Sequence, residues 1–161
     1  MRVFLSYTRN KDDFGAVSGF RERLTSELKN YDKNVLVYQD KSEIEAGANY
    51  PADLQTALEG TDVLLAHISP SWLGSKWCRW EFDVFSENGM NSAKLLKVIP
   101  LLVVPTVEVN SESNDHIAKL LSSVQSIDVS DLRNVSQSST AYKKFVAKLS
   151  KRINSLAIGQ K

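Results

Sequence analysis

The sequence predicts an α/β fold, a flavodoxin-like doubly wound sandwich in which helices flank a five-stranded parallel sheet. Three observations lead to this prediction. Short apolar runs recur along the 161-residue chain, helical patterns separate them, and each run is continuously hydrophobic instead of alternating with polar residues. A parallel sheet covered by helices on both faces has strands of this kind, because both sides of each strand are buried.

The expected strands follow from the apolar runs, of which the last is the weakest. They are Val3 to Ser6, Val35 to Tyr38, Val63 to Ile68, Val98 to Val104, and Val124 to Val129. Pro100 stands inside the fourth run and has no amide hydrogen to donate to a neighbouring strand. We therefore expect a bulge or an edge position at Pro100.

The expected helices lie between these strands and after the last one. The first is marked by apolar residues at steps of three and four, which give a helix one buried stripe: Val17, Phe20, Leu24 and Leu28. Shorter helices are expected from about Ala52 to Leu58 and from Asn114 to Ser123. A long amphipathic helix at the end is marked by Tyr142, Phe145, Leu149 and Ile153.

A tryptophan-rich segment after the third strand predicts one more helix, from Ser75 as the N-cap to a point before Gly89. Within it, Glu81 has no basic residue three or four positions away, whereas Asp83 has Arg79 four residues back. Glu81 either points to water or is held in an apolar cleft, where desolvation disfavours its charged form. Both remain open, because aromatic residues at helical spacing are commonly core and a lone glutamate is commonly solvated.

Parallel α/β sheets bind ligands outside the carboxyl ends of their strands, where the strand order reverses. The loops that leave those ends are Tyr7 to Asp13, Gln39 to Tyr50, Ser69 to Lys76, and Thr106 to Asp115. Glu81, near the start of its helix, lies on that side of the predicted sheet.

Composition limits the expected partners and the expected cellular compartment. Twenty basic and 19 acidic residues leave a net charge of +1, which favours neither nucleic acid nor an anionic membrane as a partner. No apolar run approaches the roughly 20 residues needed to span a bilayer, and the N-terminus begins with a strand pattern instead of a signal peptide. Cys78 is the only cysteine, which fits a reducing compartment. We expect a single cytoplasmic domain over residues 1–161.

Several kinds of site are disfavoured by the motifs. The turn after the first strand has only Gly15, so a phosphate-binding glycine loop is improbable and no bound cofactor is expected. His67, His116 and Cys78 lack metal-ligand spacing, so no metal is expected, and a structural role suits all three better. The end of the third strand has no aspartate that could accept a phosphoryl group.

Three motifs in order resemble those of the TIR (Toll/interleukin-1 receptor) domain family. They are Phe4-Leu-Ser-Tyr7 followed by Arg9, then Asp40-Lys-Ser-Glu-Ile-Glu-Ala-Gly47, then Ile68-Ser-Pro-Ser-Trp-Leu-Gly-Ser-Lys-Trp-Cys-Arg-Trp-Glu81. The resemblance covers about residues 1 to 105. It implies a five-stranded parallel flavodoxin-like fold, in agreement with the prediction from the apolar runs.

The resemblance also implies a function, since many TIR domains cleave the bond between nicotinamide and ribose in NAD⁺. In the enzymatic branch, to which bacterial members belong, the catalytic glutamate stands four residues after a tryptophan. That position is Glu81 here, and the tryptophan is Trp77. The residues that the resemblance implies for substrate binding are Ser6, Tyr7, Arg9, Glu45, Gly47 and Trp77. Glu45 and Gly47 lie in the loop after the second strand, whose Glu-Ala-Gly core is similar to that of enzymatic members.

NAD⁺ is then the substrate, and other TIR domains are the expected partners, because family members commonly act after self-association. A role in antiphage defence or cell-death signalling, and a sensor module fused or separate, are implied by the resemblance alone. The chain can be the N-terminal part of a larger protein. Linear and cyclic ADP-ribose both remain open as products. A non-catalytic TIR scaffold and a related enzyme with another glycosidic substrate remain as alternatives.

Overall fold

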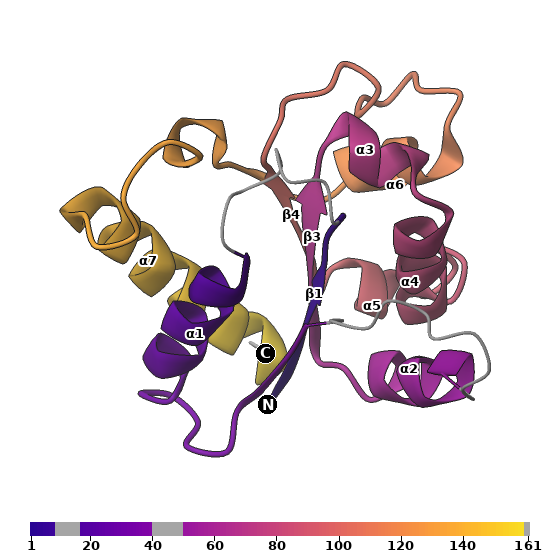
Figure 1. Cartoon of the computed structure of the whole chain (residues 1–161). Coiled ribbons are helices and arrows are strands. Elements are labelled where there is room, and N and C mark those ends of the chain that lie inside the picture. The colour runs from indigo at the N-terminus through magenta and orange to yellow at the C-terminus, as the bar shows by residue number, and fades with distance from the viewer. Residues whose placement is uncertain (9–16, 40–49, 160–161) are drawn as a thin grey trace.

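A computed structural model describes residues 1–8, 17–39 and 50–159 of the chain. Its centre is a parallel sheet with the strand order β2-β1-β3-β4-β5 (Figure 1). The strands are β1 (Arg2–Ser6), β2 (Leu36–Gln39), β3 (Val63–Ile68), β4 (Val98–Leu102) and β5 (Ile127–Asp128). The predicted fold class is confirmed. The fifth strand is much shorter than its apolar run.

Seven α-helices lie in the described residues, with one 3-10 turn (Ser130–Leu132). The helices are α1 (Val17–Leu28), α2 (Tyr50–Glu59), α3 (Pro70–Gly74), α4 (Lys76–Ser86), α5 (Ser92–Leu95), α6 (His116–Ser122) and α7 (Thr140–Ala157). The sequence prediction lacked α3 and α5, because helices this short cannot show a helical period. The stripe predicted for the first helix is confirmed, since all four of its residues are buried.

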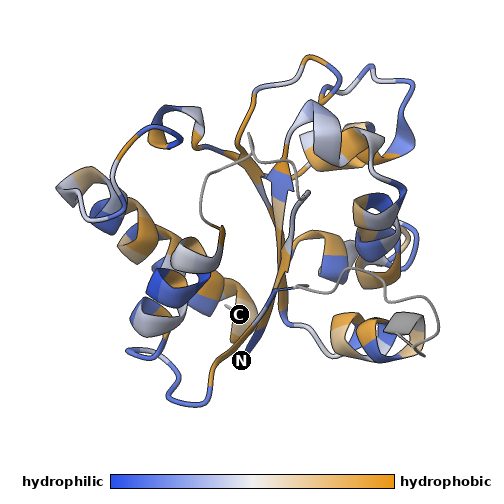
Figure 2. Ribbon diagram, viewed as in Figure 1, coloured by the Kyte–Doolittle hydropathy of each residue, from blue (hydrophilic) through white to orange (hydrophobic). Residues whose placement is uncertain are grey.

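The helices form a layer on each side of the sheet, with α1 and α7 on one side and α2 to α6 on the other (Figure 1). Alternate residues of a strand serve opposite layers: Val3 and Leu5 of β1 pack with α1 and α7, and Phe4 packs with the other layer. Figure 2 shows the apolar colouring along the sheet and along the helices that cover it. The described residues therefore form two apolar cores, separated by the sheet.

Pro100 pairs with Ala66 of β3, while β5 pairs only with Leu101 and Leu102 of β4. In the described part of the chain, β4 thus has a partner on one side only at Pro100. The expected edge position is not found, because β4 lies between β3 and β5 in the sheet. Pro100 is tolerated there because it precedes the residues that pair with β5, so its missing amide hydrogen leaves no gap in that pairing.

The capping residues of α4 match the predicted bounds. The Ser75 hydroxyl accepts a hydrogen bond from the Cys78 amide at 3.2 Å, as an N-cap does. The helix ends in a left-handed turn, with φ angles of 53° at Glu87, 57° at Asn88 and 74° at Gly89. These two ends fix where Glu81 lies along the helix.

The sheet order reverses between β1 and β3, because β2 lies on one side of β1 and β3 on the other. A crevice outside the carboxyl ends of β1 and β3 is where doubly wound sheets bind ligands. Ser6 ends β1 and Ile68 ends β3, so the predicted site lies at this position.

Among the described residues, no helix has both the length and the apolar content that crossing a membrane requires.

Candidate active site

Glu81 lies in the interior at the carboxyl end of β1, with only 2% of its surface exposed. Its Oε2 accepts a hydrogen bond of 2.6 Å from the hydroxyl of Ser6, the last residue of β1. Cys78, Phe82 and Phe85 of the same helix are also buried around it. Of the two sequence interpretations, the carboxylate held in an apolar interior is confirmed. The structure brings Ser6 and Glu81 together.

Trp72, in α3, is the member of this cluster that sequence reasoning missed. Its indole Nε1 donates a hydrogen bond of 3.0 Å to the Ser6 hydroxyl oxygen, and its side chain is fully buried. The Trp72 amide donates to Ser69, which caps α3. A signal was available, since a buried tryptophan needs an acceptor for its N–H and Ser6 stands at a strand end. Sequence alone could not say which acceptor.

Arg79, two residues before Glu81, is directed toward α6. Its guanidinium donates to both carboxylate oxygens of Asp115, at 2.7 and 3.1 Å, and to the Leu73 carbonyl at 3.1 Å. Asp115 also caps α6, because its side chain accepts from the amides of the first turn. The Arg79 hydrogen bond is the main reason that the pKa of Asp115 lies below its ordinary value.

Asp83 does not take the salt bridge with Arg79 that its spacing allowed. Burial raises the pKa of Asp83 above its ordinary value, and the nearby charges of Arg79 and His116 offset only part of this effect. A helix pair at this spacing stabilises by only about 0.2–0.5 kcal/mol, whereas Asp115 offers a two-point contact from a helix cap. The tertiary partner therefore replaces the local one.

Tyr7 follows β1 directly and is half-buried, with its ring packed against the core on the α1 and α7 side. Its hydroxyl accepts a hydrogen bond of 3.1 Å from Gln39 at the end of β2. Its carbonyl accepts from the Cys78 thiol at 3.5 Å, so the predicted packing role of Cys78 is confirmed. Tyr7 and Glu81 thus lie at one strand end, with the Tyr7 ring and the carboxylate in different layers.

Trp77 stacks on Trp80, with ring centroids 5.1 Å apart and an angle of 27° between the planes. Both rings are half-buried against the core on the α4 side. Trp77 lies one helical turn before Glu81, as its spacing requires. Its predicted contact with a ligand stays a prediction.

Arg9, Glu45 and Gly47 lie outside the described residues, so their predicted roles also stay predictions.

His67 is buried in β3, with its ring edge-on to Phe20 at 5.4 Å, which suits the predicted structural role. No group of three or more His, Cys, Asp or Glu side chains in the described ranges is arranged to hold a metal ion.

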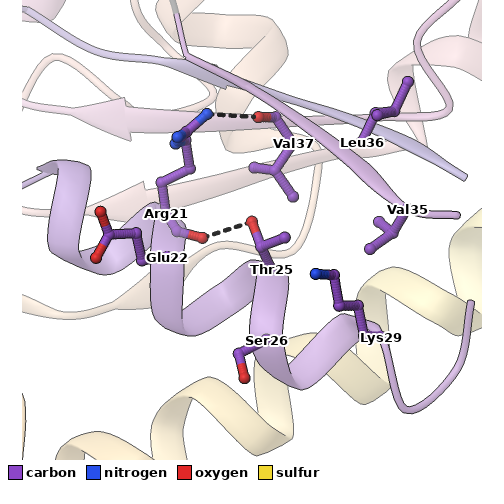
Figure 3. Close-up of a pocket in the computed structure, with 8 residues that line it drawn as sticks. All are labelled: Arg21, Glu22, Thr25, Ser26, Lys29, Val35, Leu36 and Val37. Atoms are coloured by element: carbon purple, nitrogen blue, oxygen red, sulfur yellow. Dashed lines mark hydrogen bonds between the residues drawn. The ribbon is translucent and has the colours of Figure 1, made fainter. Parts of the chain in front are cut away.

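A separate cavity of about 410 Å³ lies between α1 and β2 (Figure 3). Arg21 reaches from α1 to the Val37 carbonyl there, and Lys29 lies toward the other end of the helix. The residues that line this cavity include neither Ser6 nor Glu81. It is therefore distinct from the cluster at the end of β1.

Comparison with protein families adds an independent finding. A family model described as the TIR domain matches residues 3–147, which is most of the chain and includes all of β1 except its first residue, and α4. No curated protein matches the chain.

Proposed function

The chain belongs to the TIR domain family, and from this premise we propose that it cleaves the bond between nicotinamide and ribose in NAD⁺. The protein acts in this proposal as a glycohydrolase or a cyclase that becomes active on self-association. TIR domains in general either associate with other TIR domains or cleave NAD⁺.

The observation that carries the proposal is the buried Glu81 carboxylate at the reversal point of the sheet. Removing an ionised carboxylate from water is unfavourable unless hydrogen bonds compensate. Here the Ser6 hydroxyl supplies one such bond at 2.6 Å. A protein that serves only as a scaffold gains nothing from a buried acid at this position, whereas an enzyme gains a fixed negative charge.

The chemistry suits a single fixed anion. When the bond between the ribose carbon and nicotinamide breaks, the electron pair leaves with neutral nicotinamide and the ribose acquires positive charge. A carboxylate in a low-dielectric interior stabilises that charge more strongly than one in water. The leaving group needs no proton from the enzyme.

The second step fills the empty position on the ribose carbon. Water attack gives ADP-ribose and releases one proton. Attack by an adenine nitrogen or a ribose hydroxyl of the same molecule gives a cyclic ADP-ribose without addition of water, and a hydroxyl nucleophile also releases its proton. In the proposal, Trp77 and Tyr7 shape the pocket and Arg9 binds a phosphate. Ser6 supports the carboxylate, while Glu45 and Gly47, which lie outside the described residues, contribute to substrate binding in this proposal. The biological role is that of a signalling or cell-death effector in antiphage defence.

The test is nicotinamide release from NAD⁺ by concentrated protein, measured by chromatography. Glu81→Gln keeps the size of the side chain and an acceptor for Ser6 but removes the charge, so we expect a loss of about 100-fold or more. Glu59→Gln is the matched control, because Glu59 is exposed at the end of α2. Equal rates for Glu81→Gln and the unmodified protein overturn the assignment.

A scaffold function is the second candidate, and one observation favours it. Leu36 and Tyr38 on the edge strand β2 are 49% and 39% exposed. Apolar side chains on an open sheet edge are suited to contact with another protein. Self-association in sedimentation experiments, without nicotinamide release at any concentration, would favour this candidate.

A further inference from the structure

Three buried side chains from three elements form a continuous chain of hydrogen bonds. Trp72 of α3 donates to Ser6 of β1 at 3.0 Å, and Ser6 donates to Glu81 of α4 at 2.6 Å. Each of the three is at most 2% exposed. We name this chain, Trp72 to Ser6 to Glu81, the indole–serine relay.

The chemistry of the groups fixes the direction of the relay. An indole N–H can only donate, and an ionised carboxylate can only accept. The Ser6 hydroxyl, with one hydrogen and two lone pairs, must therefore accept from Trp72 and donate its hydrogen to Glu81.

The indole itself is held firmly. The Trp72 amide donates to the Ser69 hydroxyl at 3.1 Å, which ties α3 to the end of β3. The Trp72 ring meets the Phe82 ring edge-on, with centroids 6.4 Å apart. Phe82 follows Glu81 in α4, so the donor end and the acceptor end of the relay are also joined by packing.

From these contacts we propose that Trp72 is a positioning residue for Glu81 and acts through Ser6. By occupying a lone pair of the Ser6 oxygen, the indole N–H orients the hydroxyl hydrogen toward Glu81. The carboxylate is then fixed before substrate binds, which spares reorganisation during the reaction. This inference rests on the proposed NAD⁺ cleavage.

The first test is Trp72→Phe, which keeps an aromatic ring and removes the donor. We expect kcat to fall roughly threefold to tenfold, the equivalent of one net hydrogen bond, while KM changes by less than about twofold. Tyr142→Phe is the control, since it removes a polar hydroxyl group from a buried aromatic side chain in α7, in the opposite helix layer. We expect the control to retain its kcat. An unchanged kcat in Trp72→Phe overturns the proposal.

The second test separates positioning from packing. If Trp72 acts through Ser6, adding Trp72→Phe to Ser6→Ala causes no further loss of kcat, although it lowers the melting temperature further. Losses of kcat that multiply in the double variant mean that Trp72 acts by packing alone. Should Trp72→Phe fail to fold, a benzothiophene analogue at position 72, with sulfur in place of the N–H, keeps the ring shape for the same comparison.

A readout that needs no catalysis separates failure of the relay from failure of the proposed function. In ¹⁵N-labelled protein, the indole N–H resonance of Trp72 should exchange slowly and should move in Ser6→Ala. An unmoved resonance overturns the relay whether or not the protein cleaves NAD⁺. A moved resonance in a protein that releases no nicotinamide supports the hydrogen bonds and rejects the proposed function.

Discussion

Glu81 and Ser6 are 75 residues apart in the sequence and are joined by a hydrogen bond of 2.6 Å in the interior. This bond connects the first turns of α4 to the last residue of β1, at the point where the sheet order reverses. Loss of this hydrogen bond should therefore affect both the stability of the protein and the position of the Glu81 carboxylate.

Ser6→Ala should lower the free energy of unfolding by about 1–3 kcal/mol, because two buried groups lose a partner in a single substitution. One is the Glu81 carboxylate and the other is the Trp72 indole N–H. Urea unfolding monitored by circular dichroism measures this loss. Ser26→Ala, on the exposed side of α1, is the control and should change stability by no more than about 0.5 kcal/mol. Equal stability of the two variants would show that the bond contributes little.

Asp83→Asn should stabilise the folded protein at pH 7. Burial raises the pKa of Asp83, so its protonated form is favoured in the folded state. Such a group stabilises the fold below its unfolded pKa of about 3.8, and this contribution is lost as the pH rises through the folded pKa. Asparagine resembles the neutral form at every pH. The gain in melting temperature should therefore be present at pH 7 and disappear below pH 3.8.

Asp115→Asn should have the opposite effect at pH 7. The Arg79 hydrogen bond lowers the pKa of Asp115, so its charge stabilises the fold above the unfolded value of 3.8. That contribution is lost as the pH falls through the folded pKa. Asparagine can still cap α6 through its side-chain oxygen, so the difference from the unmodified protein reports the charge. Melting curves from acidic to neutral pH test both aspartates. If Asp83→Asn and Asp115→Asn changed the melting temperature in the same direction at pH 7, the opposite pKa shifts of the two residues would be contradicted.

Gly89→Ala should lower the free energy of unfolding by about 1–2 kcal/mol. Gly89 has a φ angle of 74°, and an added Cβ would lie 2.4 Å from a methyl group of Leu120. Gly74→Ala is the comparison, because Gly74 ends α3 and an added Cβ there meets nothing within 4 Å. Gly74→Ala should be neutral or slightly stabilising, since alanine is the better helix former. Denaturant midpoints of the two variants give the contrast.

The rate of nicotinamide release per molecule should rise with protein concentration if self-association completes the site. The measurement is the initial rate at fixed NAD⁺, compared with the fraction of oligomer seen by light scattering. A rate per molecule that stays constant while the oligomer fraction rises would show that a single copy is sufficient.

The sequence by itself determined the fold class and the approximate positions of the main helices and strands. The apolar stripe of α1 and the caps of α4 each depend on residues that are only a few positions apart in the sequence. Periodicity and capping chemistry therefore reveal both features directly. The position of Glu81 at the carboxyl edge of the sheet followed from the order of the strands. The roles of Trp77, Tyr7, Arg9, Glu45 and Gly47 came from resemblance and remain predictions.

Only the tertiary structure decided which partner each of these side chains meets. It paired Arg79 with Asp115, 36 residues away, instead of Asp83, and it placed the indole of Trp72 on Ser6. Local patterns carry no information on such pairs, because the partners come from segments that meet only once the sheet has assembled. The physical reason is burial: in the interior each polar group must find a hydrogen-bonding partner, and the fold determines which partner is within reach.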